Sequence, residues 1–504
     1  MSSASIRFDS VDLDVFGDAS FDQNPLHVSE GYARKTPYGE RVVFGVLAII
    51  AALRVLPARG GWRLARLEAD FLSPLFVGVE YRVELTTRSE TEARVTVSDG
   101  LIELLTIRLL LEPGLANGDA VPVDAVRVRD VPADHDSASI AHASRIEGTY
   151  VPKATAAAEL AARFGLTERG VGAAHLAALL WSSYLIGMEL PGERALFSRL
   201  TLQVDNEAGS RGGALQYAAN VEGFDERFNL VRIHGALRVG SALFATAEMS
   251  AFIRDDAPAP SAQAMRELLP PSRRLQDRIA LVTGASRGFG ARLSLALALQ
   301  GCTVLVNFLR SAENAAALAD ELREGPGSIV PLRGDASDLV WSAATRERIL
   351  AEYGGLDVLV CNAALPLRAI SLEQQQAARL VEYVSKSFAL ATTPMAAFLD
   401  LVAARAGWNV VMSSSAVQDP PRDWPHYVSA KAAIEALARV SVMQHPGAGC
   451  LIVRPPRMLT DLTNDPAPFA RQRALRPEVV AAQVARRLLE PPVPGVVEVL
   501  DSFS

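Results

Sequence analysis

Residues 279–290 read IALVTGASRGFG, and this stretch decides the fold of the C-terminal part of the chain. An apolar run that predicts a buried strand leads through a glycine-rich turn into a helical stretch, ARLSLALALQ. Four more apolar runs alternate with helical stretches further along, at residues 303–308, 356–362, 408–414 and 450–456. Strands buried on both faces and separated by helices are typical of a parallel sheet covered on both sides. Residues 277–504 are therefore predicted to form an α/β, Rossmann-type doubly wound sheet.

The glycine-rich turn suits the phosphates of a dinucleotide. Gly284 permits the tight turn, Gly288 lets the backbone approach a phosphate, and Gly290 allows close helix packing. Free N–H groups at the start of the helix favour a pyrophosphate. The loop residues predicted to bind the cofactor are Gly284, Ser286, Arg287, Gly288, Phe289 and Gly290. A strand-to-helix turn without a ligand is the alternative interpretation.

The end of the next strand indicates which dinucleotide is bound. NAD would favour an acidic residue there, because a carboxylate accepts a hydrogen bond from the ribose 2′-hydroxyl. The sequence has Asn307 and Arg310 instead, and Arg287 lies in the glycine turn. Two guanidinium groups near the ribose suit a 2′-phosphate, so NADP(H) is the expected cofactor. Each arginine alone could equally be a solvated surface charge.

Residues 427–431 read YVSAK and place Tyr427 and Lys431 on one face of a predicted helix. An ammonium near a phenol favours the phenolate and lowers the phenol pKa from about 10. The tyrosine would then be a usable acid–base group near neutrality. Taken alone, a Tyr–Lys pair at this spacing is more often a solvent-exposed pair without a catalytic role.

The order of the motifs is more specific than any one of them. TGASRGFG (283–290), GDASD (334–338), CNAA (361–364), VVMSSS (410–415) and YVSAK follow one another, a series that resembles the short-chain dehydrogenase/reductase family over residues 277–504. The resemblance implies that Tyr427 gives a proton to the substrate carbonyl and that Lys431 holds the nicotinamide ribose. It implies that Ser414, with Ser415 as the runner-up, hydrogen-bonds the developing oxyanion.

The same resemblance places Asp335 by the adenine and Asn362 near the ribose. Three positions depart from the family pattern. Cys361 replaces the first asparagine of the usual NNAG, Ser385 stands for the helix asparagine of the proton relay, and Pro456 follows Pro455 where Pro–Gly is usual.

The first half of the chain has another pattern. After an opening loop, an apolar helix is predicted at residues 42–56, and four strand-like runs follow at 62–72, 79–90, 92–100 and 103–112. The middle of the chain repeats this order, with a helix at 171–188 followed by strand-like runs at 190–204, 215–224 and 230–252. Each copy predicts an α+β unit with a helix packed on an antiparallel sheet, and the two apolar helices require that the copies pair.

Two proline-rich stretches, residues 112–136 and 255–276, divide the chain. The second is predicted to be a linker without a helix, because it contains Pro258, Pro260, Pro270 and Pro271. The predicted domains are accordingly residues 1–115, 136–257 and 277–504.

The first domain carries an acid–base candidate in the hexapeptide DQNPLH (22–27). Asn-Pro forces a turn from which Asp22 and His27 could point into one pocket, where a carboxylate and an imidazole can share proton transfer. An Asx-type turn with a surface histidine is the alternative. The hexapeptide resembles MaoC-type hotdog proteins, the (R)-specific enoyl-thioester hydratases and dehydratases, when taken with Ala33, Thr36, Gly39, Gly45 and FLSPLFVG (71–78).

This second resemblance covers residues 8–112 and implies a double hotdog whose second copy lacks a matching Asp–His pair. It implies that Asp22 and His27 add or remove water, either of them being the base, and that the N–H of Gly45 polarises the thioester carbonyl. His175, on the second apolar helix, is expected to be a hydrogen-bonded core histidine.

Composition excludes several classes. The 504 residues suggest about three domains. The formal net charge of −7 gives no sign of the positive charge that a nucleic-acid-binding protein would need. Three scattered cysteines predict neither a disulfide framework nor a metal site, and favour a reducing, cytoplasmic location. The first residues lack a signal-peptide pattern, and the longest charge-free apolar run, 42–53, is too short to span a bilayer.

Together the two resemblances predict a bifunctional enzyme. It would be an NADPH-dependent 3-oxoacyl-thioester ketoreductase and an (R)-3-hydroxyacyl-thioester dehydratase in fatty-acid-like or polyketide biosynthesis. Its substrates would be carried by acyl carrier protein or coenzyme A, and the family implies a homo-oligomer. The alternatives are a ketoreductase whose hotdog region is a non-catalytic carrier-binding or assembly module, and a reductase of a sugar, aromatic ketone or other carbonyl compound.

Overall fold

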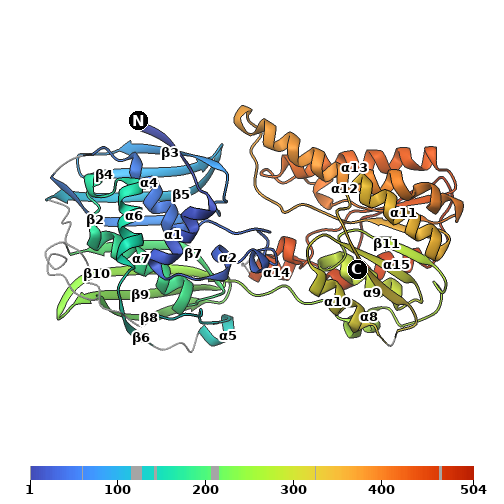
Figure 1. The fold of residues 1–504 in the computed structure, drawn as a ribbon, viewed down its shortest axis with the longest axis horizontal. Coiled ribbons are helices and arrows are strands. Elements are labelled where there is room, and N and C mark those ends of the chain that lie inside the picture. The colour runs from blue at the N-terminus through green and yellow to red at the C-terminus, as the bar shows by residue number, and fades with distance from the viewer. Residues whose placement is uncertain are drawn as a thin grey trace. The chain divides into compact units, whose positions relative to one another are not determined.

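The computed structural model describes residues 2–58, 61–114, 128–140, 145–205, 215–323, 325–464 and 468–503. The chain divides into two compact units, the first made of residues 1–256 with 465–471 and the second of residues 257–464 with 472–504. In Figure 1 the first unit carries a long antiparallel sheet, and the second carries a parallel sheet flanked by helices.

The first unit is a double hotdog built on one ten-stranded sheet. Its strands are β1 (Ser2–Arg7), β2 (Trp62–Phe71), β3 (Glu80–Thr87), β4 (Glu92–Asp99), β5 (Ile102–Pro113), β6 (Ile146–Tyr150), β7 (Ala195–Val204), β8 (Leu215–Asp225), β9 (Leu230–Val239) and β10 (Ala242–Ile253). The order β1-β3-β4-β5-β2-β7-β10-β9-β8-β6 contains the same five-strand arrangement twice, and antiparallel pairing of β2 with β7 joins the copies. The predicted repeat and the pairing of its copies are confirmed.

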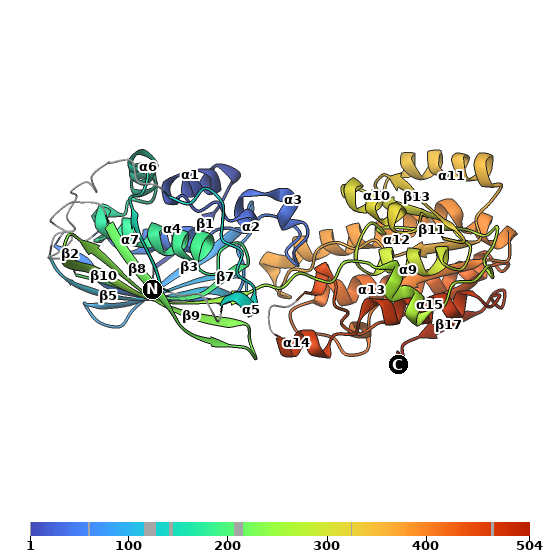
Figure 2. The ribbon, with the colours of Figure 1, turned by 90° about the horizontal axis from the view of Figure 1, so that it is seen from below.

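The helices of this unit lie on one face of the sheet, as Figure 2 shows. They are α1 (Ser10–Ser20), α2 (Pro25–Val28), α3 (Glu30–Ala33), α4 (Gly45–Ala52), η1 (Leu53–Val55), α5 (Ser137–Ile140), α6 (Ala154–Phe164), η2 (Thr167–Arg169), α7 (Ala173–Tyr184) and the π-helical turn η3 (Leu185–Glu189). The two apolar helices α4 and α7 are packed against each other and almost completely buried. Their apolar surfaces, which no single copy could cover, form the centre of the core.

The opening segment is not the predicted loop. Residues 2–7 form the edge strand β1, which pairs with β3, and α1 follows. Asp9 and Asp12 form a reciprocal capping box at the start of α1, with each side chain accepting from the other's backbone N–H. Such a box gives hydrogen-bond partners to two backbone N–H groups that would otherwise lack them at the start of a helix. It helps α1 to form although its apolar residues are only weakly periodic.

The second unit is the predicted Rossmann-type doubly wound sheet. Its strands are β11 (Ile279–Val282), β12 (Thr303–Phe308), β13 (Ser328–Arg333), β14 (Val358–Cys361), β15 (Trp408–Met412), β16 (Gly449–Val453) and β17 (Val497–Leu500). They are all parallel, in the order β13-β12-β11-β14-β15-β16-β17, so the strand order reverses between β11 and β14. Ligands of open α/β sheets bind beyond the carboxyl ends of the strands at such a reversal.

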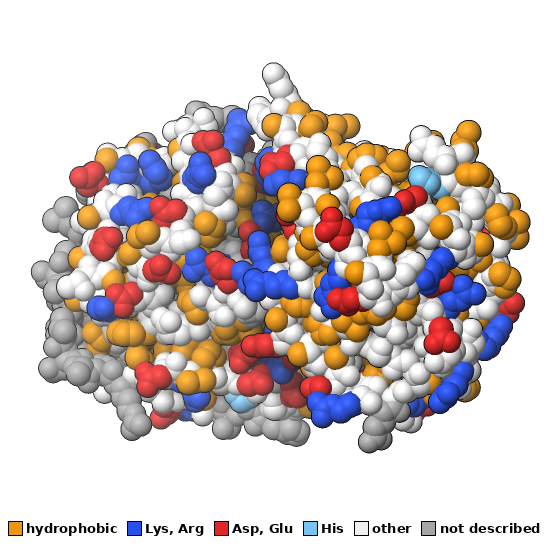
Figure 3. All heavy atoms as spheres, turned by 45° about the vertical axis from the view of Figure 1, so that its right-hand side comes forward, with side chains coloured by type: hydrophobic (Ala, Val, Ile, Leu, Met, Phe, Trp, Pro, Cys, Tyr) orange, Lys and Arg blue, Asp and Glu red, His pale blue; other side chains and the backbone are white. Residues whose placement is uncertain are grey.

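Helices cover both faces of this sheet and enclose two apolar clusters. They are α9 (Gly288–Ala298), α10 (Ala312–Glu321), α11 (Leu339–Tyr353), η5 (Gln374–Gln376), α12 (Ala377–Ala404), η6 (Ser415–Val417), α13 (Pro425–Gln444), η7 (Asp461–Thr463) and α15 (Pro477–Leu488). Most of α14 (Pro468–Arg473) belongs to the first unit. The stretch Gln374–Ala404 has the length and hydropathy of a membrane span, but α12 packs on α11, α13, β14 and β15. On the face drawn in Figure 3, basic and acidic side chains are interspersed, in line with the small net charge.

The second proline-rich stretch is not the helix-free linker that the sequence predicts. It contains α8 (Ala262–Leu268), which begins at the capping residue Ser261 and buries Ala262 and Met265 in the core of the second unit. The four prolines flank this helix instead of interrupting it, so its backbone N–H groups are intact. Residues 115–127 of the first predicted linker lie outside the described residues.

Candidate functional sites

The DQNPLH turn is held by the second hotdog copy. Asn24 caps α2, because its Oδ1 accepts from the N–H of Leu26 at 3.0 Å, and Pro25 occupies the first helical position. The Asn24 Nδ2 donates to the carbonyl of Gly192 at 2.9 Å. The cap fixes the turn between Asp22 and His27 locally. The hydrogen bond to Gly192 fixes the same turn through the second copy.

Asp22 lies buried against α7. Its Oδ2 accepts from the Ser183 hydroxyl at 2.7 Å, and its Oδ1 accepts from the Asn24 N–H at 3.0 Å. A Cβ on Gly187 would lie 2.3 Å from Oδ1, so only glycine leaves room for the carboxylate there. Burial raises the pKa of Asp22 to about 7, although both hydrogen bonds oppose the rise. Asp22 is therefore able to hold or release a proton near neutrality.

His27 is held in one tautomer. Its Nδ1 lies 2.7 Å from the carbonyl oxygen of Val42, which can only accept, so Nδ1 carries the proton and Nε2 keeps its lone pair. The ring stacks on Phe44 with centroids 4.1 Å apart. Burial lowers the pKa of His27 to about 4. The imidazole is consequently neutral at pH 7 and can act as a base through Nε2.

Gly45 begins α4 next to His27, because its neighbour Phe44 is both the residue before the helix and the stacking partner of the imidazole. No side chain caps this helix start, so its first N–H groups are available to a ligand oxygen. A Cβ on Gly45 would lie 2.7 Å from the ring of Phe71. The structure thus brings His27 close to Gly45. It places the Asp22 side chain against α7, where Ser183 donates to it.

The sequence analysis did not identify Ser183. It lies in an apolar helix, and the sequence around it shows no motif. Its importance comes from the pairing of the two copies, which brings α7 to the turn at Asp22. His175, on the same helix, is a core histidine as predicted, with Nδ1 accepting from the Gly172 N–H and Nε2 lying 2.7 Å from the Leu64 carbonyl.

The glycine-rich turn of the second unit has the expected backbone. Gly284 and Gly288 have positive φ values of 61° and 60°. A Cβ on Gly284 would lie 2.7 Å from the Cα of Ala363, whereas a Cβ on Gly288 would come no nearer than 3.8 Å to Thr460. Space is therefore left beside Gly288, and the start of α9 has no side-chain cap. Both features suit a phosphate group.

Two asparagines brace this turn from inside the protein. The Asn362 Nδ2 donates to the carbonyls of Thr283 and Gly284 at 3.0 and 2.9 Å. A Cβ on Gly290 would lie 2.5 Å from that nitrogen. Asn307 accepts from the Gly284 N–H and donates to the Gly334 carbonyl. Their amides position the glycine turn against β12 and β14.

The remaining predicted cofactor residues surround the turn. Ser286 and Phe289 are buried, and Arg287 lies 3.5 Å from the carboxylate of Asp461. Arg310 is exposed just after β12. Asp335, after β13, accepts from the N–H and hydroxyl of Ser337 through Oδ1.

Of the three consecutive serines, Ser414 lies beside Tyr427. A side-chain hydrogen bond to Ser414 lowers the pKa of Tyr427, but burial outweighs it and raises that pKa. The Ser413 hydroxyl instead donates to Glu435 at 2.6 Å, and the Ser415 backbone N–H binds the Pro455 carbonyl. The structure therefore brings Ser414 and Tyr427 together.

Lys431 lies one helical turn from Tyr427 on α13. Its Nζ donates to the Met412 carbonyl at 2.6 Å and lies 5.7 Å from the centre of the Tyr427 ring. Burial lowers the pKa of Lys431 to about 8. The predicted lowering of the Tyr427 pKa by this lysine is not seen, because burial of the phenol dominates and the ammonium is directed at a backbone carbonyl.

Ser385 does not reach this site. It lies on the exposed face of α12, whereas Tyr383, two residues earlier, packs edge-on against His426 with ring centroids 4.4 Å apart. Burial raises the pKa of Tyr383, and the neighbouring Tyr427 phenol adds to that rise. Two residues of helix rotate a side chain by more than half a turn, so only the three-dimensional structure shows which α12 side chain faces Tyr427.

Two family models match this chain. One described as short chain dehydrogenase matches residues 278–467, and one described as MaoC like domain matches residues 2–104. Cis-4-hydroxycyclohexanecarboxylate dehydrogenase of Sinomonas cyclohexanicum is 32% identical over 223 residues, which are 42% of this chain and 88% of that protein.

Shorter matches are found with fungal reductases. Elsinochrome reductase 1 of Elsinoe fawcettii is 35% identical over 92 residues, 18% of this chain and 34% of that protein. Versicolorin reductase stcU of Emericella nidulans is 33% identical over 92 residues, 18% of this chain and 35% of that protein. The chain thus spans about a third of the length of these relatives.

Solved structures also match part of this chain. An alcohol dehydrogenase from the archaeon Thermococcus sibiricus, complexed with 5-hydroxy-NADP, gives a TM-score of 0.41 at 25% identity and covers 45% of this chain and 96% of that one. A short chain dehydrogenase from Burkholderia cenocepacia J2315, in complex with NADP, gives a TM-score of 0.40 at 26% identity. The match covers 45% of this chain and 98% of that one.

Proposed function

Because the chain belongs to the short-chain dehydrogenase family and carries a MaoC-like hotdog domain ahead of that part, we propose that it is a bifunctional ketoreductase and dehydratase of acyl thioesters. One observation carries the proposal. A single chain holds two acid–base sets, Ser414–Tyr427–Lys431 in the second unit and Asp22–His27 in the first, and each set contains one buried member, Lys431 and Asp22.

The reductase half would convert a 3-oxoacyl thioester to the 3-hydroxyacyl thioester. When bound, the nicotinamide cofactor supplies the hydride to the ketone carbon. Tyr427 would give its phenolic proton to the ketone oxygen, and the Ser414 hydroxyl would hydrogen-bond the same oxygen. Lys431, whose burial favours loss of its proton, would help return a proton to Tyr427.

The glycine turn and the start of α9 fit the phosphates of the cofactor, because the helix start is uncapped and nothing crowds Gly288. Arg287 and Arg310 support NADP(H) over NAD, since each would offer a guanidinium to a 2′-phosphate. The absence of an acidic residue at the end of β12 supports the same choice.

The dehydratase half would then remove water to give the trans-2-enoyl thioester. The order of the two pKa values favours His27 as the base that takes the C2 proton and Asp22 as the acid that protonates the leaving hydroxyl. The N–H of Gly45 would stabilise the enolate oxygen that develops on the thioester. Acyl carrier protein and coenzyme A both present a pantetheine arm, and either would serve as the carrier.

The test is mass spectrometry of a 3-oxoacyl thioester incubated with the protein and NADPH. The expected product is one water lighter than the 3-hydroxyacyl thioester. Tyr427→Phe should abolish all turnover of the oxo substrate, whereas Asp22→Asn should stop the reaction at the hydroxyacyl stage. A wild-type reaction that ends at the hydroxyacyl stage would leave a ketoreductase with a hotdog binding module, and no consumption of NADPH with any 3-oxoacyl thioester would overturn the proposal.

A further inference from the structure

Arg254 is a buried cation beside the hotdog site. It follows the last strand, β10, and only 8% of it is exposed. Its Nη2 donates to the Tyr32 hydroxyl at 3.1 Å and to the Glu193 carbonyl at 2.8 Å, and its guanidinium lies 5.5 Å from the centre of the Tyr32 ring. The Nε is buried, and none of the described residues forms a hydrogen bond with it.

Among the described residues, no ion pair joins this guanidinium to an acid, although the charges of Glu193 and Asp256 also act on Tyr32. Asp256 pairs with Arg194 at 3.1 Å, and Asp255 accepts from the Asn229 amide at 2.9 Å. Within the described part of the chain, the hydrogen-bond partners of the Arg254 side chain are both uncharged. A buried charge normally has a counter-ion, because removing it from water is costly.

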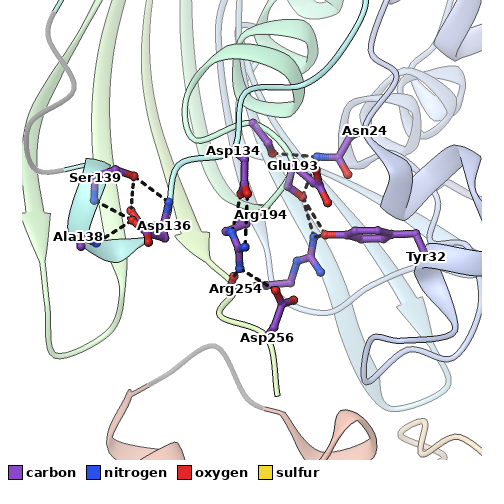
Figure 4. A network of polar contacts seen from close by, with 11 residues as sticks. Asn24, Tyr32, Asp134, Asp136, Ala138, Ser139, Glu193, Arg194, Arg254 and Asp256 are labelled. Atoms are coloured by element: carbon purple, nitrogen blue, oxygen red, sulfur yellow. Dashed lines mark hydrogen bonds and ion pairs between the residues drawn. The ribbon is translucent and has the colours of Figure 1, made fainter. Parts of the chain in front are cut away.

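The position of Arg254 connects it to the acid–base pair. Figure 4 shows that the Glu193 carbonyl, which accepts from Arg254, also accepts from the Nδ2 of Asn24. Asn24 stands between Asp22 and His27 in the sequence, and Tyr32 follows the same turn on α3. The positive charge of Arg254 also acts on the imidazole, where it adds to burial in lowering the pKa of His27.

We infer that Arg254, held by Tyr32, binds a carboxylate on the acyl group of the hotdog substrate, directly beyond the reacting carbons. The thioester oxygen already has the start of α4 as its donor, and the phosphate of a pantetheine arm lies many bonds away from the carbons that His27 must reach. A carboxylate at the fourth carbon, where crotonyl has its methyl group, would pair with the guanidinium as a charge-assisted hydrogen-bond acceptor. This inference rests on the proposed dehydratase function.

The test compares two coenzyme A thioesters of the same shape, fumaryl and crotonyl, which end in a carboxylate and in a methyl group. The wild-type protein should hydrate the fumaryl thioester with a kcat/KM at least tenfold higher. Arg254→Gln should reduce that preference to near unity, and Arg254→Lys should retain part of it. Arg227→Gln removes an exposed charge of the same unit that pairs with Asp225, so it should keep the preference. Equal rates for the two thioesters in the wild type, or an equal loss for both in Arg254→Gln, would overturn the inference.

Binding separates this inference from the dehydratase proposal. Calorimetry with the saturated pair, succinyl and butyryl coenzyme A, requires no reaction. Tighter binding of the succinyl thioester that is lost in Arg254→Gln would support the anion site even if neither enoyl thioester were hydrated, a result that would contradict only the dehydratase. Equal binding of the two saturated thioesters would contradict the anion site.

Discussion

The hydroxyl of Ser183 donates a 2.7 Å hydrogen bond to Oδ2 of Asp22. The donor belongs to the second hotdog copy and the acceptor to the first. The pairing of β2 with β7 and the packing of α4 on α7 bring the two residues together. The second copy therefore completes the site of the first.

Ser183→Ala is expected to raise the pKa of Asp22 further, because this hydrogen bond opposes the effect of burial. The alkaline limb of the dehydratase pH–rate profile should move to higher pH, and kcat should fall about tenfold as the carboxyl loses its fixed position. Ser182→Ala is the matched control, since the Ser182 hydroxyl only donates to the Leu179 carbonyl. An unshifted profile in Ser183→Ala would contradict the positioning role.

The dehydratase rate is expected to depend on pH as a bell with limbs near pH 4 and pH 7. The reaction as proposed needs His27 neutral and Asp22 protonated, and the two pKa values are about 4 and about 7. The rate should fall below pH 4 as His27 gains a proton and above pH 7 as Asp22 loses one. A rate that rises through pH 7 would instead make the Asp22 carboxylate the base.

Asp22→Asn is expected to stabilise the protein at high pH. The folded pKa of Asp22 lies above the unfolded value near 4, so the stability that its protonated form contributes is present at low pH and is lost as pH rises through about 7. Above pH 8 the neutral amide avoids this loss, which is on the order of 4 kcal/mol. The loss develops between about pH 4 and pH 7, so denaturant titrations should show a small gain at pH 5 and the full gain at pH 8.5, while dehydration falls by about 100-fold or more.

Glu435→Gln is expected to destabilise the second unit by about 1–3 kcal/mol. The buried Glu435 carboxylate accepts from the Ser413 hydroxyl and from two nitrogens of Arg454, so the change leaves a largely buried guanidinium without its counter-charge. Thermal unfolding measures the effect. Glu352→Gln, which loses an exposed pair with Arg348 and alters a hydrogen bond to the Tyr353 side chain, is the control and should change stability by less than about 1 kcal/mol.

Gly288→Ala is expected to weaken NADPH binding while the protein still folds. The φ of 60° makes a side chain cost about 1 kcal/mol there, and the added methyl would occupy space left for a phosphate. Gly495→Ala imposes the same kind of strain at a φ of 74° in a turn preceding β17, far from the glycine loop in the sequence. Calorimetry should show a loss of about tenfold in NADPH affinity for Gly288→Ala alone, and equal affinities would argue against the phosphate site.

Much of the fold could be predicted from local patterns. The apolar runs at 279–284 and 303–308 and the alternating runs of the first half are strands in the structure, and the element order of the first half predicts its duplication. The helix α8 was missed because proline content describes a stretch as a whole, whereas a helix needs only that its own residues lack proline. Strand β1 was missed because its short polar alternation SSASIR is stabilised by pairing with β3, which is distant in sequence.

The spacing of Tyr427 and Lys431, the glycine turn and the DQNPLH turn are properties of the sequence by itself, because helix periodicity and turn preferences act over a few residues. The residues that contact those groups could not be predicted from the sequence. Only the tertiary structure shows that Ser183 and Gly187 enclose Asp22, that Ser414 and not its neighbours lies at Tyr427, that Tyr383 faces the site in place of Ser385, and that Arg254 is buried near His27. The physical reason is that burial and long-range hydrogen bonds set pKa values and positions, and both depend on segments that folding brings together from distant parts of the chain.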